Sequence, residues 1–154
     1  MPQRSKSRLT VAGWKEILSL PGLGLRGLKA KLDTGARTAA LHAADILVYE
    51  SPDGPRVAFT VYPHPQIDRT GVRCTAPLID RRGVTNSGGL EEERLVIEAD
   101  IQLGDQFWRA EVTLTDRTRM RYPMLLGRTT LEGRFLVDPQ RSYLMRPGRK
   151  GASR

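Results

Sequence analysis

One short sequence constrains the fold of this chain more than any other: Asp33-Thr34-Gly35, which directly follows an alternating apolar and basic run over residues 28–32. The alternation predicts a strand with one solvent-exposed face, and the Thr-Gly after the aspartate predicts a tight turn where the strand ends. About ninety residues later, a second apolar run over residues 124–126 ends in Gly127. Such a chain is expected to present one carboxylate at a strand end and to bring a glycine-bearing strand beside it.

Each residue of this turn has a physical reason to be there. The preceding strand gives the Asp33 carboxylate a defined position. Thr34 can hydrogen-bond laterally and hold the turn, while Gly35 has no Cβ, so a second backbone can approach and its N–H can reach the carboxylate. Gly127 would let the second strand pass close behind the turn.

The motif occurs only once, which bears on the chemistry it can support. Two carboxylates about 3 Å apart share one proton, so that one acts as an acid while the other activates water. No other aspartate of this chain is followed by Thr-Gly or Ser-Gly. Those aspartates are Asp45, Asp53, Asp68, Asp80, Asp100, Asp105, Asp116 and Asp138. One chain therefore supplies half of such a site and would have to dimerise to complete it.

The length and composition predict one ordinary globular domain. A chain of 154 residues can build a real core, and 39% of its residues are apolar. No apolar run approaches the ~20 residues that a membrane helix needs, and none follows the basic start, so neither a membrane span nor a signal peptide is predicted. The single cysteine, Cys74, excludes an internal disulfide and favours a cytoplasmic location.

The net charge of +8 is concentrated at the two ends of the chain. Residues 1–8 carry three basic side chains and residues 146–154 carry four, and neither segment has an acid, so the body is close to neutral. We expect two disordered basic tails, 1–8 and 146–154, around a domain at 9–145. The tails either favour acidic partners such as RNA, ribosomes or glutamate-rich peptides, or are solvated ends with no specific role.

The pattern along the chain predicts an all-β fold, with many short strands and turns every eight to twelve residues. Strands are predicted over residues 14–20, 28–32, 39–49, 57–62, 94–103, 107–114, 124–126, 135–137 and 143–145. One helical turn is predicted over 129–133. Residues 63–90 are rich in Pro, Gly and polar groups, which predicts a long loop or extended hairpin. We expect this segment to include a flap over the site, with a hinge at Ser87-Gly88-Gly89. Arg81, Arg82 or Arg94 could then reach substrate carboxylates from above.

Two patterns in the sequence could indicate a cofactor or a metal, and each has a simpler interpretation. Residues 22–27 fit G-x-G-x-x-G, but this run follows a proline and leads into a strand, so a glycine turn is favoured over dinucleotide binding. No P-loop sequence occurs. A zinc site would have to gather His42, His64 and Cys74 from separate segments, whereas the simpler interpretation is a small buried cysteine and a satisfied histidine.

With these motifs in view, the chain resembles the retropepsin-like aspartic peptidase family, in the bacterial branch encoded near RimK-type glutamate ligases and often labelled "ATP-dependent zinc protease". The resemblance covers about residues 13–145. The segments that carry it are 13–14, 29–38, 40–42, 81–82, 86–89, 92–94, 114–117, 124–129 and 133–139. It implies a closed retropepsin-like β-barrel with one short C-terminal helical turn. It also implies a homodimer in which Asp33, with Thr34 and Gly35, forms the catalytic motif. The sequence contains no zinc-binding motif and no ATP-binding motif, so no cofactor or metal is expected.

Positive charge around the motif sets this chain apart from viral members of the fold. The position four after the aspartate is typically acidic there, and here it is Arg37. The residues expected to bind substrate are Lys31, Arg37, His42, Arg81, Arg94 and Arg128. Such a cluster needs anions to balance it, and glutamate-rich peptides would supply them. The alternative is that these bases pair with Glu16, Glu50 or Glu132 and only hold the fold.

The first hypothesis is thus a homodimeric aspartic endopeptidase that hydrolyses acidic tails. The resemblance suggests poly-glutamate tails, such as those added to a ribosomal protein by the neighbouring ligase, with that RimK-type ligase as a further expected partner. A second hypothesis is a non-catalytic module on the same barrel that binds acidic peptides or ribosomes. A third is a zinc hydrolase, which would bind one metal per chain.

Overall fold

The computed structural model describes residues 9–85, 88–116 and 121–145. The predicted tails, 1–8 and 146–154, lie outside this range, as do Asn86 and the first residue of the predicted hinge, Ser87. The strands are β1 Thr10–Gly13, β2 Lys15–Leu20, β3 Leu25–Leu32, β4 Ala39–His42, β5 Ala44–Ser51, β6 Gly54–Val61, β7 Val72–Pro77, β8 Asp80–Thr85, β9 Glu91–Leu103, β10 Gln106–Thr115, β11 Met124–Leu126 and β12 Phe135–Asp138. A 3-10 turn spans Pro21–Leu23, and one helical turn, α1, spans Arg128–Leu131.

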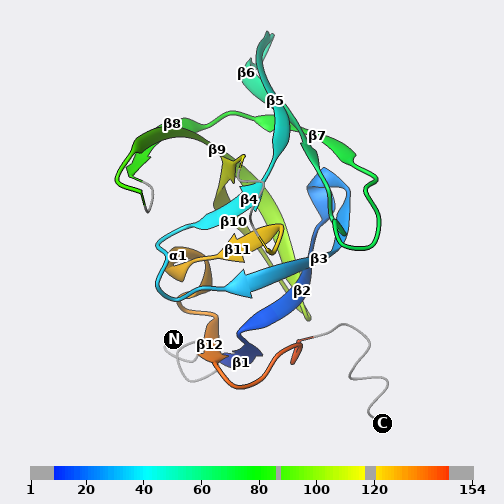
Figure 1. The fold of residues 1–154 in the computed structure, drawn as a ribbon, viewed down its shortest axis with the longest axis vertical. Helices are drawn as coiled ribbons and strands as arrows, with labels where there is room; N and C mark the ends of the chain where they lie inside the picture. Colours follow the sequence, from blue (N-terminus) through cyan, green and yellow to red (C-terminus); the bar gives the residue numbers. More distant parts are fainter. Residues whose placement is uncertain (1–8, 86–87, 117–120, 146–154) are drawn as a thin grey trace.

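Six strands close into a barrel, which confirms the predicted fold class (Figure 1). They follow the order β10-β4-β11-β3-β2-β9, and β9 returns to pair with β10. The short strand β11 runs parallel to β3 and antiparallel to β4. It therefore joins the two strands that flank the Asp33 turn. The predicted helical turn is also confirmed, because α1 follows β11 directly.

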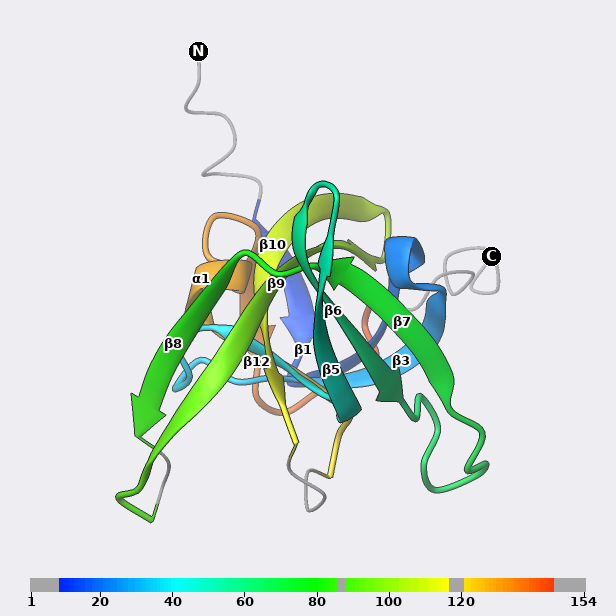
Figure 2. The ribbon, with the colours of Figure 1, turned by 90° about the horizontal axis from the view of Figure 1, so that it is seen from above.

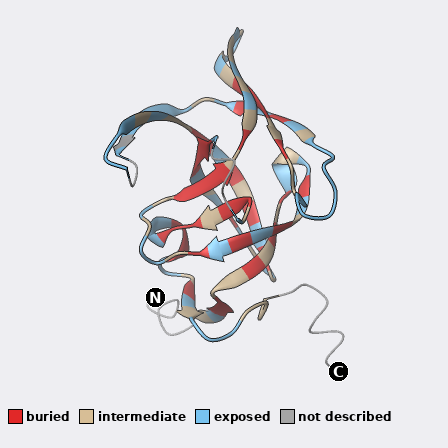
Figure 3. Cartoon of the chain, in the orientation of Figure 1, coloured by how far each residue is buried: buried red, intermediate tan, exposed pale blue. Residues whose placement is uncertain are grey.

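Strand β3 shows why these residues form a barrel wall. Leu28, Ala30 and Leu32 are buried, while Lys29 and Lys31 between them are exposed, which is the period-2 pattern of a strand with one wet face. The inward side chains of the other strands join the same core, so buried positions alternate with exposed ones along the ribbon (Figure 3). The glycine turn over residues 22–27 is confirmed, since Gly24 and Gly27 adopt positive φ angles of 74° and 64°.

Three further groups of strands lie outside the barrel, and one of them is the parallel pair of β1 and β12. Strands β5, β6 and β7 form a separate three-stranded sheet, whose Val57, Phe59 and Val61 are buried in the common core. Strand β8 pairs with the 13-residue strand β9. The β8–β9 hairpin extends to one side of the barrel and the β5–β6–β7 sheet to the other (Figure 2). Among the described residues, no helix is long and apolar enough to cross a membrane.

The prediction of a long loop over residues 63–90 was wrong in part, because the segment contains β7 and β8. In β7 the buried positions are Val72 (partly), Cys74 and Ala76, alternating with exposed residues. Two of these three are small and weakly apolar, so the alternation was hard to read from the sequence. Strand β8 is mostly polar and owes its conformation to the ladder that it forms with β9.

Two predicted strand boundaries also need correction. The predicted strand over residues 39–49 is two strands, because β4 pairs with β10 and β11 whereas β5 leaves the barrel to pair with β6. Residues 143–145 are not a strand. The N–H groups of Leu144 and Met145 donate to the Glu16 carboxylate, at 2.9 and 3.0 Å, instead of to a neighbouring strand.

Glu16 is a buried carboxylate that holds the end of the domain in place. Its side chain is fully buried, and it accepts a third hydrogen bond from the Gly13 N–H at 2.6 Å. Gly13 itself cannot carry a side chain, since a Cβ would lie 2.6 Å from the Arg141 carbonyl oxygen. The C-terminal segment of the domain therefore packs against the junction of β1 and β2 through backbone groups.

Candidate active site

The Asp33 turn lies at the end of β3, where three backbone contacts define it. The Asp33 N–H donates to the Leu126 carbonyl at 2.8 Å, and the Ala36 N–H donates to the Asp33 carbonyl at 3.1 Å. The Gly35 N–H donates to Asp33 Oδ1 at 2.9 Å. A Cβ on Gly35 would lie 3.2 Å from the same oxygen, closer than most Cβ contacts. The motif thus orients its own carboxylate, as its sequence predicts.

The second glycine motif supports the turn from behind. The N–H groups of Arg128 and Thr129 donate to the carbonyls of Ala36 and Arg37 at 2.8 and 2.9 Å. Arg128 Nη1 also donates to the Gly35 carbonyl at 3.4 Å. The start of α1 is therefore bonded directly to the chain that follows Asp33.

Gly127 allows this close approach, and we predict that Gly127→Ala is strongly destabilising. A Cβ there would lie 2.5 Å from the Thr38 carbonyl oxygen and 2.7 Å from its nitrogen, and both are backbone atoms. Relieving the overlap means moving the turn, so we expect a loss of about 2–4 kcal/mol in the free energy of unfolding. Gly22→Ala is the matched control, because the nearest atom to its Cβ would be Asp100 Oδ2 at 3.8 Å. Equal unfolding midpoints in urea for the two variants would contradict this account.

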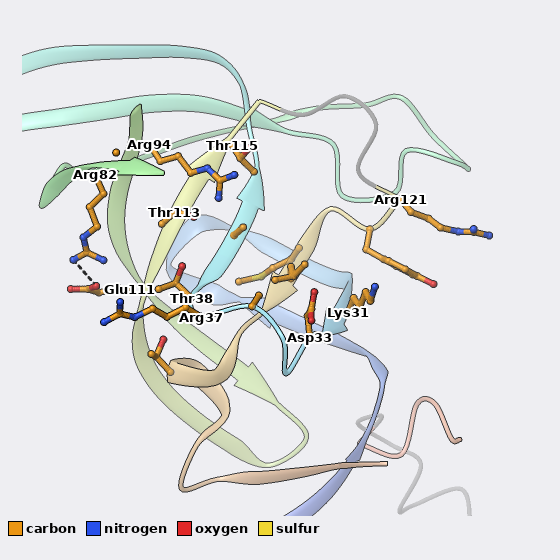
Figure 4. Close-up of a pocket in the computed structure, with 17 residues that line it drawn as sticks. Lys31, Asp33, Arg37, Thr38, Arg82, Arg94, Glu111, Thr113, Thr115 and Arg121 are labelled. Carbon is orange, nitrogen blue, oxygen red and sulfur yellow. Dashed lines mark ion pairs between the residues drawn. The ribbon is translucent and has the colours of Figure 1, made fainter. Parts of the chain in front are cut away.

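Asp33 opens into a cavity of about 1000 Å³ (Figure 4). Strands β3, β4, β8, β9, β10 and β11 all contribute to its wall. Its charged lining is strongly unbalanced, with five basic side chains and two acidic ones. They are Lys31, Arg37, Arg82, Arg94, Arg121, Asp33 and Glu111. A smaller cavity of about 190 Å³ shares Arg121 and Tyr122 with the first and adds Lys15 and Lys29 to its lining.

The β8–β9 hairpin brings two arginines to the cavity. Arg82 donates to Asp80 at 2.9 Å and pairs with Glu111 at 2.9 Å. The hydrogen bond to Asp80, followed by that to Glu111, raises the pKa of Arg82, and the hydrogen bond from Arg82 lowers the pKa of Asp80. Arg94 pairs with Glu92 at 3.4 Å. Of the two acids in the lining, Glu111 is thus already paired.

The structure brings together four of the residues predicted for the site. Asp33, Lys31, Arg37 and Arg94 all line the cavity. In Figure 4, Lys31 lies beside Asp33, while the Arg37 side chain runs away from it. The ion pairs of Arg82 and Arg94 use Asp80, Glu111 and Glu92 rather than the predicted Glu16, Glu50 or Glu132.

Five other predicted site residues do not line the cavity. Thr34 and Gly35 are exposed on the turn itself. Arg128 contacts the Gly35 carbonyl, and Arg81 pairs with Glu93 at 3.3 Å. The His42 ring lies 3.2 Å from the Thr115 carbonyl oxygen.

Arg121 takes part in the lining although it was not predicted. Arg82 was expected only as one of three arginines that could reach substrate from the flap, and it lines the cavity as well. Which of two adjacent residues on a strand faces the cavity depends on the pairing of β8 with β9, and this pairing was not predicted.

The three candidate zinc ligands lie on separate elements. His42 belongs to β4, His64 follows β6 and its ring would meet a Cβ on Gly27 at 3.4 Å, and Cys74 belongs to β7. Within residues 9–85, 88–116 and 121–145, no group of three or more His, Cys, Asp or Glu gathers to hold a metal. Burial raises the pKa of the Cys74 thiol to about 11, as expected of a small buried side chain.

Known proteins with similar sequences carry ligase names. The chain is 41% identical over 137 residues to a probable alpha-L-glutamate ligase of Parasynechococcus marenigrum, covering 89% of this chain and 29% of that protein. It is 39% identical over 141 residues to a probable alpha-L-glutamate ligase of Shewanella pealeana, covering 92% of this chain and 30% of that protein. The chain therefore spans less than a third of the length of these relatives.

A solved structure and a family model each match most of this chain. A Legionella pneumophila protein of unknown function superposes with a TM-score of 0.74 at 30% identity, covering 89% of this chain and 98% of that one. The family model described as "Retropepsin-like aspartic endopeptidase RimB" matches residues 11–147. This match runs from the second residue of β1 to beyond the end of β12 and includes both glycine motifs. The chain belongs to the RimB-like family of retropepsin-like aspartic endopeptidases.

Proposed function

We propose that this protein is an aspartic endopeptidase that works as a homodimer and hydrolyses acidic peptides, with poly-α-glutamate tails as the substrate class. One observation carries the proposal: a single oriented aspartate, Asp33, opens into a large cavity whose other charged side chains are mainly basic. The carboxylate supplies the chemistry. The surrounding cations supply the preference for negatively charged substrates.

The homodimer follows from the number of carboxylates in the cavity. Among the described residues, the lining holds only two acids, and Glu111 is paired with Arg82. Asp33 thus lacks the second carboxylate that this chemistry needs. A second copy of the chain would supply it across a two-fold axis near the turn. Thr34 and Gly35 are exposed, as such a contact requires.

In the dimer, the two aspartates would divide the work of hydrolysis. One ionised carboxylate takes a proton from a water molecule, whose oxygen attacks the peptide carbonyl carbon. The protonated partner donates its proton to the carbonyl oxygen, giving a tetrahedral intermediate. When the C–N bond breaks, the leaving nitrogen receives a proton, and the products are a carboxyl group and an amine.

The substrate class rests on charge and on the relatives. Five cations in the main cavity, continued by Lys15 and Lys29 in the smaller one, would favour a run of carboxylates over apolar side chains. The relatives are named glutamate ligases, and a ligase that adds α-glutamates creates this kind of tail. The protein would then trim glutamates that a RimK-type ligase has added to a protein such as a ribosomal subunit component.

The deciding experiment offers the purified protein an oligo-α-L-glutamate peptide and its glutamine counterpart. We expect cleavage of the glutamate peptide, followed by mass spectrometry, and little cleavage of the other. If the peptide binds but is never cleaved, the barrel is instead an acidic-peptide-binding module. Preference for an apolar peptide would remove the acidic substrate class.

Basic residues near Asp33 should set this preference, and we predict that Arg37→Ala lowers kcat/KM on the glutamate peptide by about tenfold or more. Contacts between a charged donor and a carboxylate contribute about 1.5–3 kcal/mol when partly desolvated. Lys31→Ala should act in the same direction but less, since an ammonium cannot bind a carboxylate through the bidentate fork that a guanidinium offers. Arg26→Ala, which removes an exposed charge of β3 outside both cavities, is the control. An equal loss of kcat/KM in all three variants would show that only the overall charge of the protein matters, and not the residues of the cavity.

A further inference from the structure

Three side chains on neighbouring strands form a row on the cavity wall. In the β8–β9 ladder, Arg82 lies directly opposite Arg94. The β9–β10 ladder ends with Leu95 opposite Leu114, and extending its antiparallel register by one residue places Arg94 opposite Thr115. Directly opposed residues project from the same face of a sheet with their Cβ atoms about 5 Å apart. All three line the cavity.

Acidic side chains neutralise the two arginines of this row to different extents. Two like charges directly opposite each other destabilise a strand pair unless acids offset them. Arg82 has two such acids, Asp80 and Glu111, each at 2.9 Å. Arg94 is more deeply buried, with 14% of its side chain exposed, and its ion pair is the longer contact of 3.4 Å from Nη2 to Glu92. The less neutralised guanidinium is therefore the one further from solvent.

Two buried polar atoms of this row lack hydrogen-bond partners among the residues that the structure describes: Arg94 Nε and Thr115 Oγ1. Thr115 is only 4% exposed. Leaving a buried donor unsatisfied is unfavourable, and such groups are rare in native proteins. Both atoms belong to the cavity lining, and in Figure 4 the two side chains lie together, apart from Asp33.

We propose that Arg94 and Thr115 form a carboxylate-binding subsite of the cavity, which holds one carboxylate of the bound peptide while Asp33 acts elsewhere on the chain. A carboxylate has two oxygens and about four lone pairs, and no donor of its own when ionised. One oxygen can accept from Arg94 Nε and the other from the Thr115 hydroxyl. The subsite rests on the proposed function for the identity of the peptide, an oligo-α-glutamate.

The carboxylate has two sources in such a peptide, a glutamate side chain or the C-terminal carboxyl group. Both present the same planar group to Arg94, and the geometry of the row accepts either. Substituting single glutamates by glutamine removes the first source one position at a time, whereas amidating the C-terminus removes the second. The position at which binding weakens identifies the group that the subsite holds.

Binding is best measured in the Asp33→Asn protein, so that cleavage does not interfere. The probe is a fluorescently labelled oligo-α-L-glutamate peptide, followed by anisotropy at fixed ionic strength. We expect Arg94→Met to weaken binding by about ten- to a hundredfold and Thr115→Val by about three- to tenfold. Arg109→Met is the control, because Arg109 is an exposed arginine of β10 that lines neither cavity. It removes the same charge and should change binding by less than about twofold.

Two further comparisons separate a binding role from a folding role. Arg94→Lys keeps the positive charge but loses the Nε donor and the planar fork. It should therefore recover little of the peptide affinity that Arg94→Met loses. In addition, the one peptide substitution that weakens binding to the parent protein should have no effect in Arg94→Met. A merely misfolded variant would not lose sensitivity at one position only.

The outcomes distinguish the subsite from the function on which it rests. If Arg94→Met binds the peptide as tightly as Arg109→Met does, or stays sensitive to the same glutamine substitution, the subsite is wrong while peptide hydrolysis by Asp33 stands. If the parent protein does not bind the glutamate peptide at all, the acidic substrate class fails and the subsite fails with it.

Discussion

Asp33→Asn is expected to lower kcat for hydrolysis of the oligo-glutamate peptide by at least about a thousandfold. The amide has nearly the same size and can still accept the Gly35 hydrogen bond, which in the wild type joins the Gly35 N–H to Asp33 Oδ1 at 2.9 Å. An amide cannot take up or release a proton at neutral pH, so neither activation of water nor protonation of the carbonyl would remain. Peptide binding should persist, which separates the loss of chemistry from the loss of fold.

Mixed dimers make this prediction sharper. When wild-type and Asp33→Asn chains are exchanged at known ratios, a site built from two Asp33 residues is active only if both chains are wild type. Activity should therefore fall with the square of the wild-type fraction. A linear fall would mean that one chain contains a whole site, and the homodimer of the proposed function would be wrong.

Asp105→Asn is the matched control for this experiment. Asp105 is an exposed acid in the turn between β9 and β10 and does not line the cavity. Its substitution removes the same charge, and activity should be unchanged. If Asp33→Asn retained activity close to that of Asp105→Asn, the carboxylate would not be catalytic.

Glu16→Ala is expected to have the largest effect on stability, a loss of about 3–5 kcal/mol in the free energy of unfolding. The substitution leaves one buried and two partly buried N–H groups without an acceptor, at about 1–1.5 kcal/mol each. They belong to Gly13, Leu144 and Met145. Because these bonds join β1 and the C-terminal segment to the junction with β2, hydrogen exchange should quicken first at these three amides.

Glu50→Ala, at an exposed position of β5, is the control and should change stability by less than about 0.5 kcal/mol. Glu16→Gln tests the role of the charge. Its amide keeps one acceptor oxygen but places an NH₂ group among N–H donors, so it should recover only part of the loss. Urea unfolding midpoints within error of the control would show that the Glu16 carboxylate is not what holds the segment.

The site motif was readable from sequence because its contacts are local. The alternation over residues 28–32 identified the strand, and the Gly35 N–H reaches Asp33 from two residues away. The contact of Gly127 is not local, because its Cβ position is filled by the backbone of Thr38, far away in the chain, and it was expected only from the lack of a side chain at that glycine. Local geometry and side-chain periodicity act within a few residues, so one sequence suffices to predict them.

The composition of the cavity wall could not be read in the same way. Arg81 and Arg82 are adjacent and chemically alike, yet only Arg82 faces the cavity, because the register between β8 and β9 selects one face. Similarly, Arg128 was expected to bind substrate but contacts the Gly35 carbonyl. Strand register depends on residues distant in sequence, and a shift by one residue exchanges the two faces.

Thus the sequence by itself determined the all-β class, the single Asp-Thr-Gly turn and the glycine behind it, because these depend on period-2 alternation and on glycine's missing Cβ. Only the tertiary structure decided that Glu16 binds three backbone N–H groups rather than a basic side chain. It also decided that Arg94 and Thr115 line the same cavity, each with an unsatisfied polar atom. Both arrangements join segments at least twenty residues apart in the chain, and only the packing of the barrel brings such segments together.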